Sequence, residues 1–93
     1  MRLTQKQEDG SCLLPQETVR PIQGGYTGPA ADRLGAFEEF CLELEAQQRE
    51  YAAQLEALRR ENRTKSVKFR ELMGKKLLNS QFLTQLRVRG LVE

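Results

Sequence analysis

The stretch that decides the fold is residues 34–72, LGAFEEFCLELEAQQREYAAQLEALRRENRTKSVKFREL, in which an apolar side chain recurs every three or four residues except at the polar positions Gln48, Asn62 and Lys65. Such spacing is typical of an α-helix with one apolar stripe, and here it follows a heptad. The a positions are residues 34, 41, 48, 55, 62 and 69, and the d positions are residues 37, 44, 51, 58, 65 and 72. The pattern predicts one long coiled-coil helix over residues 30–63.

On an isolated helix the narrow a/d stripe would stay exposed to water, so a second helix must pack along it. We expect this cover to come from further copies of the chain, which makes the protein a homo-oligomer, either a dimer or a larger assembly. Asn62, at an a position, is expected to set the register and the pairing of the helices rather than to add stability; the alternative is that it lies at a frayed or broken end of the helix. The expected oligomer interface consists of Leu34, Phe37, Cys41, Leu44, Tyr51, Leu55, Leu58, Asn62, Phe69 and Leu72.

The last third of the chain, residues 64–93, has a wider apolar face and more breaks. Thr64 or Ser66 can cap a new helix, and Asn79-Ser80 looks like a turn with Ser80 as the next N-cap. A final short helix would then end at Gly90. Because wide apolar faces on short helices favour bundle packing, the sequence predicts an all-α fold in which the long helix and these short helices form an oligomeric bundle.

The first 29 residues are expected to lie outside the helical part, as a small hairpin and a linker. Glu8-Asp9-Gly10 is a turn signal between two short strands within residues 1–14. Proline and glycine interrupt residues 15–29, which read as a linker. The segment Gly24-Gly25-Tyr26-Thr27-Gly28 either caps the long helix or cradles an anion at its start. The expected division is therefore residues 1–29, 30–63 and 64–93.

Composition excludes several classes of chemistry. The chain has 93 residues, of which 30% are charged and 39% hydrophobic, as in a helical protein rather than a disordered one. It contains no histidine, which removes Ser-His-Asp and Cys-His catalysis and the commonest metal ligand. We expect no enzyme activity, no cofactor and no metal. The carboxylates of the long helix mostly occupy solvent-facing heptad positions.

The two cysteines and the apolar segments bear on the compartment. Cys41 is expected to be a buried free thiol, and the alternative is a disulfide across a dimer seam in an oxidising compartment. The start of the chain lacks the apolar core of an export signal, and no apolar run is long enough to span a membrane. These features predict a cytoplasmic protein that does not associate with a membrane.

Charge is uneven along the sequence. Residues 31–63 carry five basic and eight acidic side chains, whereas residues 64–93 carry seven basic and two acidic ones. The basic region is either a solvated face that offsets the acidic helix or a site for a phosphate-rich or acidic partner. The candidate ligand-binding residues are Lys65, Lys68, Arg70, Lys75, Lys76, Arg87 and Arg89.

Two short segments resemble small accessory proteins of bacterial phages and prophages. They are Met1-Arg2-Leu3-Thr4 with Glu8-Asp9-Gly10-Ser11, and the run from Ala31 to Glu38, ADRLGAFE. The resemblance implies a small non-enzymatic protein inside a bacterial host, where some such proteins block host defence proteins and others sequester nucleotide signals.

These observations together predict a non-enzymatic, oligomeric binding module that inhibits a host defence protein or sequesters a nucleotide-like anionic ligand. One alternative is a dimeric DNA-binding regulator, in which residues 64–92 form a helix, a turn and a reading helix that ends in LRVRGLVE. Another alternative is a structural or assembly protein whose product is the oligomer itself.

Overall fold

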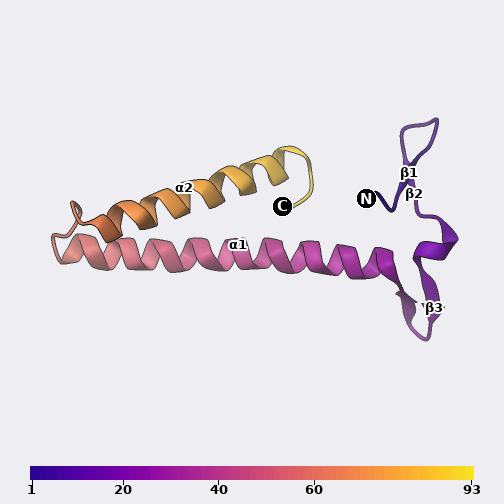
Figure 1. Ribbon diagram of the computed structural model, residues 1–93, viewed down its shortest axis with the longest axis horizontal. Coiled ribbons are helices and arrows are strands. Elements are labelled where there is room, and N and C mark those ends of the chain that lie inside the picture. Colours follow the sequence, from indigo (N-terminus) through magenta and orange to yellow (C-terminus); the bar gives the residue numbers. More distant parts are fainter. The chain divides into compact units, whose positions relative to one another are not determined.

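A computed structural model describes all residues from Met1 to Glu93 and contains two helices and two small sheets. The helices are α1 (Pro29–Arg60) and α2 (Val67–Val88), and each sheet is a pair of antiparallel strands (Figure 1). The predicted all-α class is therefore wrong. The predicted bundle of a coiled-coil helix with short C-terminal helices is also wrong, because a single continuous helix follows α1. The chain divides into two compact units, Met1–Glu39 and Phe40–Glu93.

The hairpin expected within residues 1–14 is present in the first unit. Strand β1 (Gln5–Lys6) pairs with β2 (Cys12–Leu13), and Gly10 takes a φ of 90° in the turn between them. The Asp9 carboxylate accepts hydrogen bonds from the backbone N–H and the hydroxyl of Ser11, at 2.9 and 2.6 Å. The hydroxyl bond and then the backbone bond lower the pKa of Asp9, because both stabilise the charged carboxylate.

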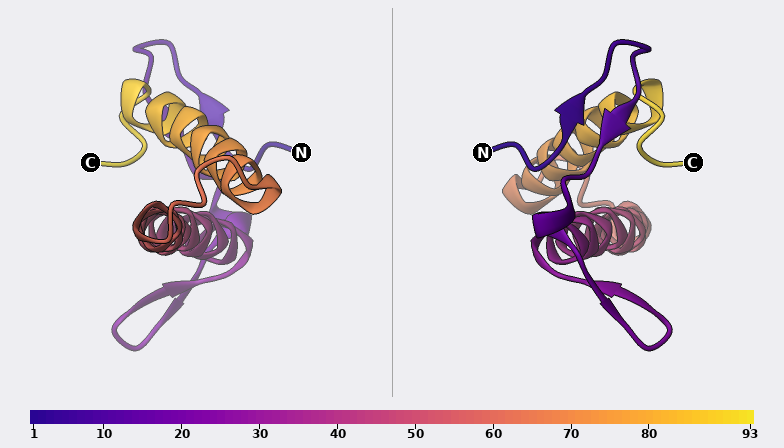
Figure 2. Two further views of the ribbon diagram at one scale, coloured as in Figure 1. Left: turned by 90° about the vertical axis from the view of Figure 1, so that its left-hand side faces the viewer. Right: turned by 90° about the vertical axis from the view of Figure 1, so that its right-hand side faces the viewer.

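A second hairpin occupies the segment that the sequence predicts to be a linker. It follows the 3-10 turn η1 (Gln16–Thr18) and consists of β3 (Arg20–Ile22) and β4 (Gly25–Thr27) (Figure 2). Pro21 lies opposite Tyr26. Proline is tolerated here because a two-stranded sheet has only edge strands, where one backbone N–H can be absent. The glycines at 24 and 25 therefore belong to a hairpin rather than to an anion cradle.

Gly28 joins the second hairpin to α1 at a point with no room for a side chain. Its φ is 125°, and a Cβ at this position would lie 2.8 Å from the carbonyl oxygen of Thr18. Thr18 is itself buried, and its hydroxyl donates to the carbonyl of Pro15 at 2.7 Å. Pro29 then opens the helix, where a missing N–H costs nothing. The close approach of Gly28 to Thr18 ties the segment after β2 to the start of α1.

In the second unit, the C-terminal part of α1 and the whole of α2 form an antiparallel helical hairpin (Figure 1). Its hydrophobic cluster consists of Leu55, Leu58 and Leu72, with Tyr51 and Phe69 packed against it. Leu55 is only 1% exposed. The stripe on α1 is therefore covered by the next helix of the same chain.

The connector between the helices has a defined hydrogen-bond pattern. Helix α1 ends at Arg60 rather than at residue 63, and Asn62 takes a left-handed φ of 58°. The N–H of Arg63 donates to the carbonyl of Leu58 at 2.8 Å, and the N–H of Asn62 donates to Arg59 at 3.1 Å. This is a Schellman motif, in which asparagine is the second choice after glycine at the left-handed position. Asn62 is exposed and ends the helix; it does not occupy a buried seam position as predicted.

Helix α2 begins at a cap that the sequence indicates and continues through a turn that it wrongly predicts. The hydroxyl of Ser66 accepts from the N–H of Phe69 at 3.1 Å, so Ser66 is the N-cap. Asn79 and Ser80 lie in the middle of the helix. The predicted stop at Gly90 is confirmed, because Gly90 has a φ of 72° and a second Schellman pair follows it.

Both cysteines are free thiols, and they differ in exposure. Cys12 in β2 is exposed, whereas Cys41 in α1 is buried, as expected for an a position. Neither α1 nor α2 is long and apolar enough to cross a membrane.

The left-handed conformation of Asn62 gives a first prediction. Asn62→Ala should lower the free energy of unfolding by about 1 kcal/mol, because a Cβ without a polar side chain is disfavoured at positive φ. Asn62→Gly should be neutral or stabilising, since glycine adopts this conformation freely. Urea unfolding followed by circular dichroism measures both. Equal stability of the alanine and glycine variants would contradict the assigned motif.

Candidate functional site

The residues predicted to form an oligomer interface fall into three groups in the structure. The first group is covered within the chain, between α1 and α2: Cys41, Leu44, Leu55, Leu58 and Leu72 are buried, and Tyr51 and Phe69 are half-buried. Leu34 and Phe37 belong to the first unit, where Leu34 is 58% exposed. Asn62 lies in the connector. The first group needs no second chain to leave water.

A layer of polar side chains interrupts the apolar seam between the two helices. The amide nitrogen of Gln48 donates to the hydroxyl of Ser80 at 2.8 Å and to the carbonyl of Lys76 at 3.0 Å. Asn79 donates to the amide oxygen of Gln47 at 2.9 Å. Gln48 Oε1 is buried without a partner. A polar layer of this kind fixes the register of two helices, since sliding them would break all three bonds.

The seven basic residues expected to bind a ligand are spread around the second unit. Lys65 lies in the connector and Arg89 caps the end of α2. Lys68 and Lys75 are seven residues apart and share a face, whereas Arg70 lies roughly 200° around the helix from Lys68. None of the seven is in a salt bridge, because the three ion pairs all lie within residues 56–63. The structure therefore does not gather them into one patch.

One predicted residue, Arg87, meets a second arginine across the seam. Arg87 of α2 and Arg49 of α1 both line a shallow pocket of about 470 Å³, together with the hydroxyls of Ser80 and Thr84. The carboxylate of Glu45 lines the same pocket. Arg87 also donates to the carbonyl of Glu93 at 3.3 Å. Because an acid stands beside the two arginines, the pocket has mixed charge.

Part of the apolar surface of α2 lies beside the seam and stays exposed. Leu78 is 54% exposed and Phe82 is 49% exposed. These two side chains share a face with Lys68 and Lys75, since the four positions are spaced by seven, three and four residues. We call Lys68, Lys75, Leu78 and Phe82 the α2 strip.

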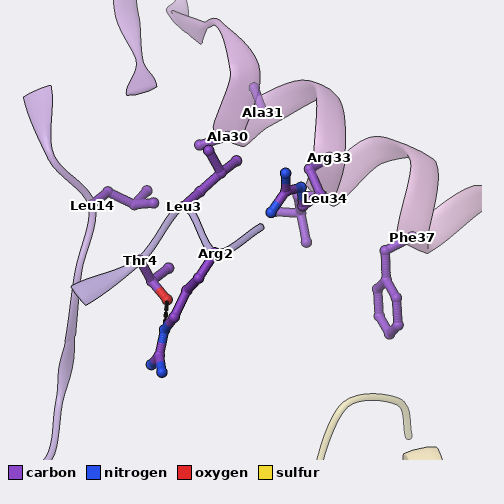
Figure 3. Close-up of a pocket in the computed structure, with 9 residues that line it drawn as sticks. All are labelled: Arg2, Leu3, Thr4, Leu14, Ala30, Ala31, Arg33, Leu34 and Phe37. Atoms are coloured by element: carbon purple, nitrogen blue, oxygen red, sulfur yellow. Dashed lines mark hydrogen bonds between the residues drawn. The ribbon is translucent and has the colours of Figure 1, made fainter. Parts of the chain in front are cut away.

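The first unit contains an apolar groove that the sequence does not indicate. It has a volume of about 650 Å³ and lies between the N-terminal segment, the end of β2 and the first turns of α1 (Figure 3). Leu3 reaches toward Ala30, and Leu14 points toward Leu3 from the other side (Figure 3). The full lining is Arg2, Leu3, Thr4, Leu14, Ala30, Ala31, Arg33, Leu34 and Phe37.

Two arginines supply the charge of this groove. Arg2 Nε donates to the hydroxyl of Thr4 at 3.1 Å (Figure 3), and Arg33 Nη1 donates to the carbonyl of Met1. No carboxylate lines the groove, and neither arginine forms a salt bridge. Only Leu34 and Phe37 of this site were expected to contact a partner. Ala30, Ala31 and Arg33 lie on the same helix as these two residues, whereas Arg2, Leu3, Thr4 and Leu14 come from the segments before and after the first hairpin and share no periodicity with α1.

No group of three or more histidine, cysteine, aspartate or glutamate side chains is arranged to hold a metal ion. The chain matches no protein-family model, no curated protein and no solved structure at a significant level. The arrangement of the residues therefore carries the functional argument.

The unpartnered oxygen of Gln48 gives a second prediction. Gln48→Leu should raise the free energy of unfolding by about 1 kcal/mol, because it removes a buried acceptor that has no donor. The hydroxyl of Ser80 can then bond to the Lys76 carbonyl of its own helix. The control is Gln54→Leu, which adds an equal apolar side chain where the glutamine only bonds to Glu50. A loss of stability in Gln48→Leu, measured by urea unfolding, would show that the two donated bonds outweigh the orphaned oxygen.

Proposed function

We propose that this chain is a non-enzymatic binding module that works as a homo-oligomer of helical hairpins. The observation that carries the proposal is the α2 strip, whose Leu78 and Phe82 stay about half exposed in a hairpin with only six buried apolar residues. Burying exposed apolar surface stabilises an assembly by about 25 cal/mol per Å². A second copy of the hairpin is the proposed cover for this strip.

Charge complementarity supports a second copy as the occupant. The exposed side of α1 carries Glu43, Ala46, Glu50, Ala53 and Ala57, spaced by three, four, three and four residues, which we call the α1 strip. Its small alanines leave room for Leu78 and Phe82 of a neighbouring copy. Its two glutamates are seven residues apart, as are Lys68 and Lys75 of the α2 strip, so two ion pairs can form along one contact.

The net charges of the two helices agree with this pairing. Helix α2 carries five basic residues and one acidic residue, whereas α1 carries four basic and seven acidic residues. Contact between two α2 helices would bring like charges together, whereas contact of α2 with the α1 of another copy brings opposite charges together. The polar layer would support the same role, because it holds each α2 strip in one register before assembly.

The resemblance of the first residues and of residues 31–38 to phage accessory proteins supports a protein of a bacterial host as the target. A regulator that reads DNA with a helix-turn-helix is not supported, since residues 67–88 form one continuous helix.

A third prediction concerns the apolar part of the α2 strip. Phe82→Glu should shift the protein from an oligomer to a monomer, because assembly would bury an unpaired charge. The control is Val88→Glu, since Val88 is 76% exposed and lies on another face of α2. Sedimentation velocity reports the masses, and circular dichroism reports folding. A monomeric wild type, or equal effects of both substitutions, would contradict the proposal.

A fourth prediction tests the charged part by exchange. Lys68→Glu with Lys75→Glu should prevent self-association, and so should Glu43→Lys with Glu50→Lys, because each double variant sets like charges against one another. An equimolar mixture of the two double variants should assemble again, since each contact then joins opposite charges. Sedimentation velocity measures the mass of each double variant and of the mixture. Failure of the mixture to assemble would exclude the pairing of these two strips.

A further inference from the structure

We infer that the apolar groove of the first unit binds an amphipathic helix of another protein, one that carries acidic side chains beside its apolar stripe. This inference rests on the proposed role as a binding module and names the class of partner that the module takes.

The wall supplied by α1 has the spacing of a helix-packing face. Ala30, Leu34 and Phe37 lie four and three residues apart, so they form one stripe on the first turns of the helix. Leu34 is 58% exposed, and Phe37 is half-buried. A stripe of this spacing is the surface that a second helix packs against, with the small Ala30 allowing close approach.

The opposite wall makes the stripe into a groove. Leu3 and Leu14 come from segments on either side of the first hairpin (Figure 3). The contact of Gly28 with Thr18 holds the segment after β2 at the start of α1, so Leu14 has a fixed position relative to Ala30. The groove volume of about 650 Å³ is in the range of ligand sites and can take several side chains of one helix face.

The charge of the groove selects an acidic partner. Arg2 and Arg33 each use a donor within the chain and keep the remaining N–H groups of the guanidinium free. No acidic residue lines the groove to neutralise them. A carboxylate beside the apolar stripe of the incoming helix would pair with either guanidinium, whereas a lysine would be repelled.

The experiment uses two fluorescein-labelled peptides of 18 residues that share one leucine stripe at i, i+4, i+7 and i+11. One peptide carries glutamate at the flanking positions, and the other carries lysine there. Fluorescence anisotropy with the full chain should show the glutamate peptide binding about three- to tenfold more tightly than the lysine peptide. Leu34→Asp should weaken the glutamate peptide about tenfold or more. The matched control is Ile22→Asp, because Ile22 is 56% exposed and lies outside the groove, so that variant should bind like the wild type.

Charge reversal in the groove provides a second arm that does not depend on Leu34. Arg2→Glu should remove the preference, because the groove then carries one acid beside Arg33, so that the two peptides bind about equally. Arg20→Glu, in β3 outside the groove, is the control and should keep the original preference. An unchanged preference in Arg2→Glu would overturn the assignment of the groove.

Further outcomes separate this inference from the proposed self-association. If decanoate binds to the groove and the glutamate peptide does not, the site takes a small apolar acid and the inference is wrong. If Leu34→Asp lowers the mass in sedimentation, the groove is occupied by a second copy, which also overturns it. If Phe82→Glu is as oligomeric as the wild type while the glutamate peptide still binds, the self-association fails and the groove stands.

Discussion

The contact of Leu55 and Leu58 with Leu72 is the interaction on which the rest of the second unit depends. These leucines lie on either side of a connector of six residues, so they meet as soon as the chain reverses. Their burial sets the direction of α2, and that direction in turn brings Asn79 and Ser80 to Gln47 and Gln48. Because the polar layer then fixes the register, the two strips face outward in a defined position. A change at the leucines would therefore alter the outer surface as well as the core.

The heptad pattern of residues 34–72 predicts which side of the helix is apolar, but not which helix packs against that side. The heptad correctly indicates a long helix with a stripe that needs cover, because periodicity reports which side of a helix is apolar. It does not report whether the cover comes from the same chain or from another one, and here Leu72 and Leu83 of α2 supply it. The left-handed backbone at Asn62 ends α1 before the chain turns into α2. Asparagine suits both a heptad seam position and a helix end, so its presence in the sequence does not choose between these cases.

Turn and cap residues predict the local structure correctly at some positions and wrongly at others. Asp9-Gly10, Ser66 and Gly90 act as expected, since turns and caps depend on residues that are close in sequence. Asn79 and Ser80 look like a turn but lie within α2, because their polar groups find partners on the opposite helix. The sequence does not predict the candidate groove, because the groove also depends on contacts between residues that are distant in the sequence. Leu3 and Leu14 become neighbours of Leu34 only after two hairpins have formed, and no spacing in the sequence relates them. The seven basic residues illustrate the same limit, since their number is visible in the sequence but their faces are not.

The different exposure of the two thiols has a consequence for following the molecule in solution. Cys12 is open to a reagent in the folded chain, whereas Cys41 is 7% exposed between α1 and α2. A thiol-specific label therefore reacts at Cys12 alone while the helical hairpin is closed, and it reaches Cys41 only when the helices separate. The ratio of the labelling rates of Cys41 and Cys12 therefore measures how often the helical hairpin opens by local unfolding.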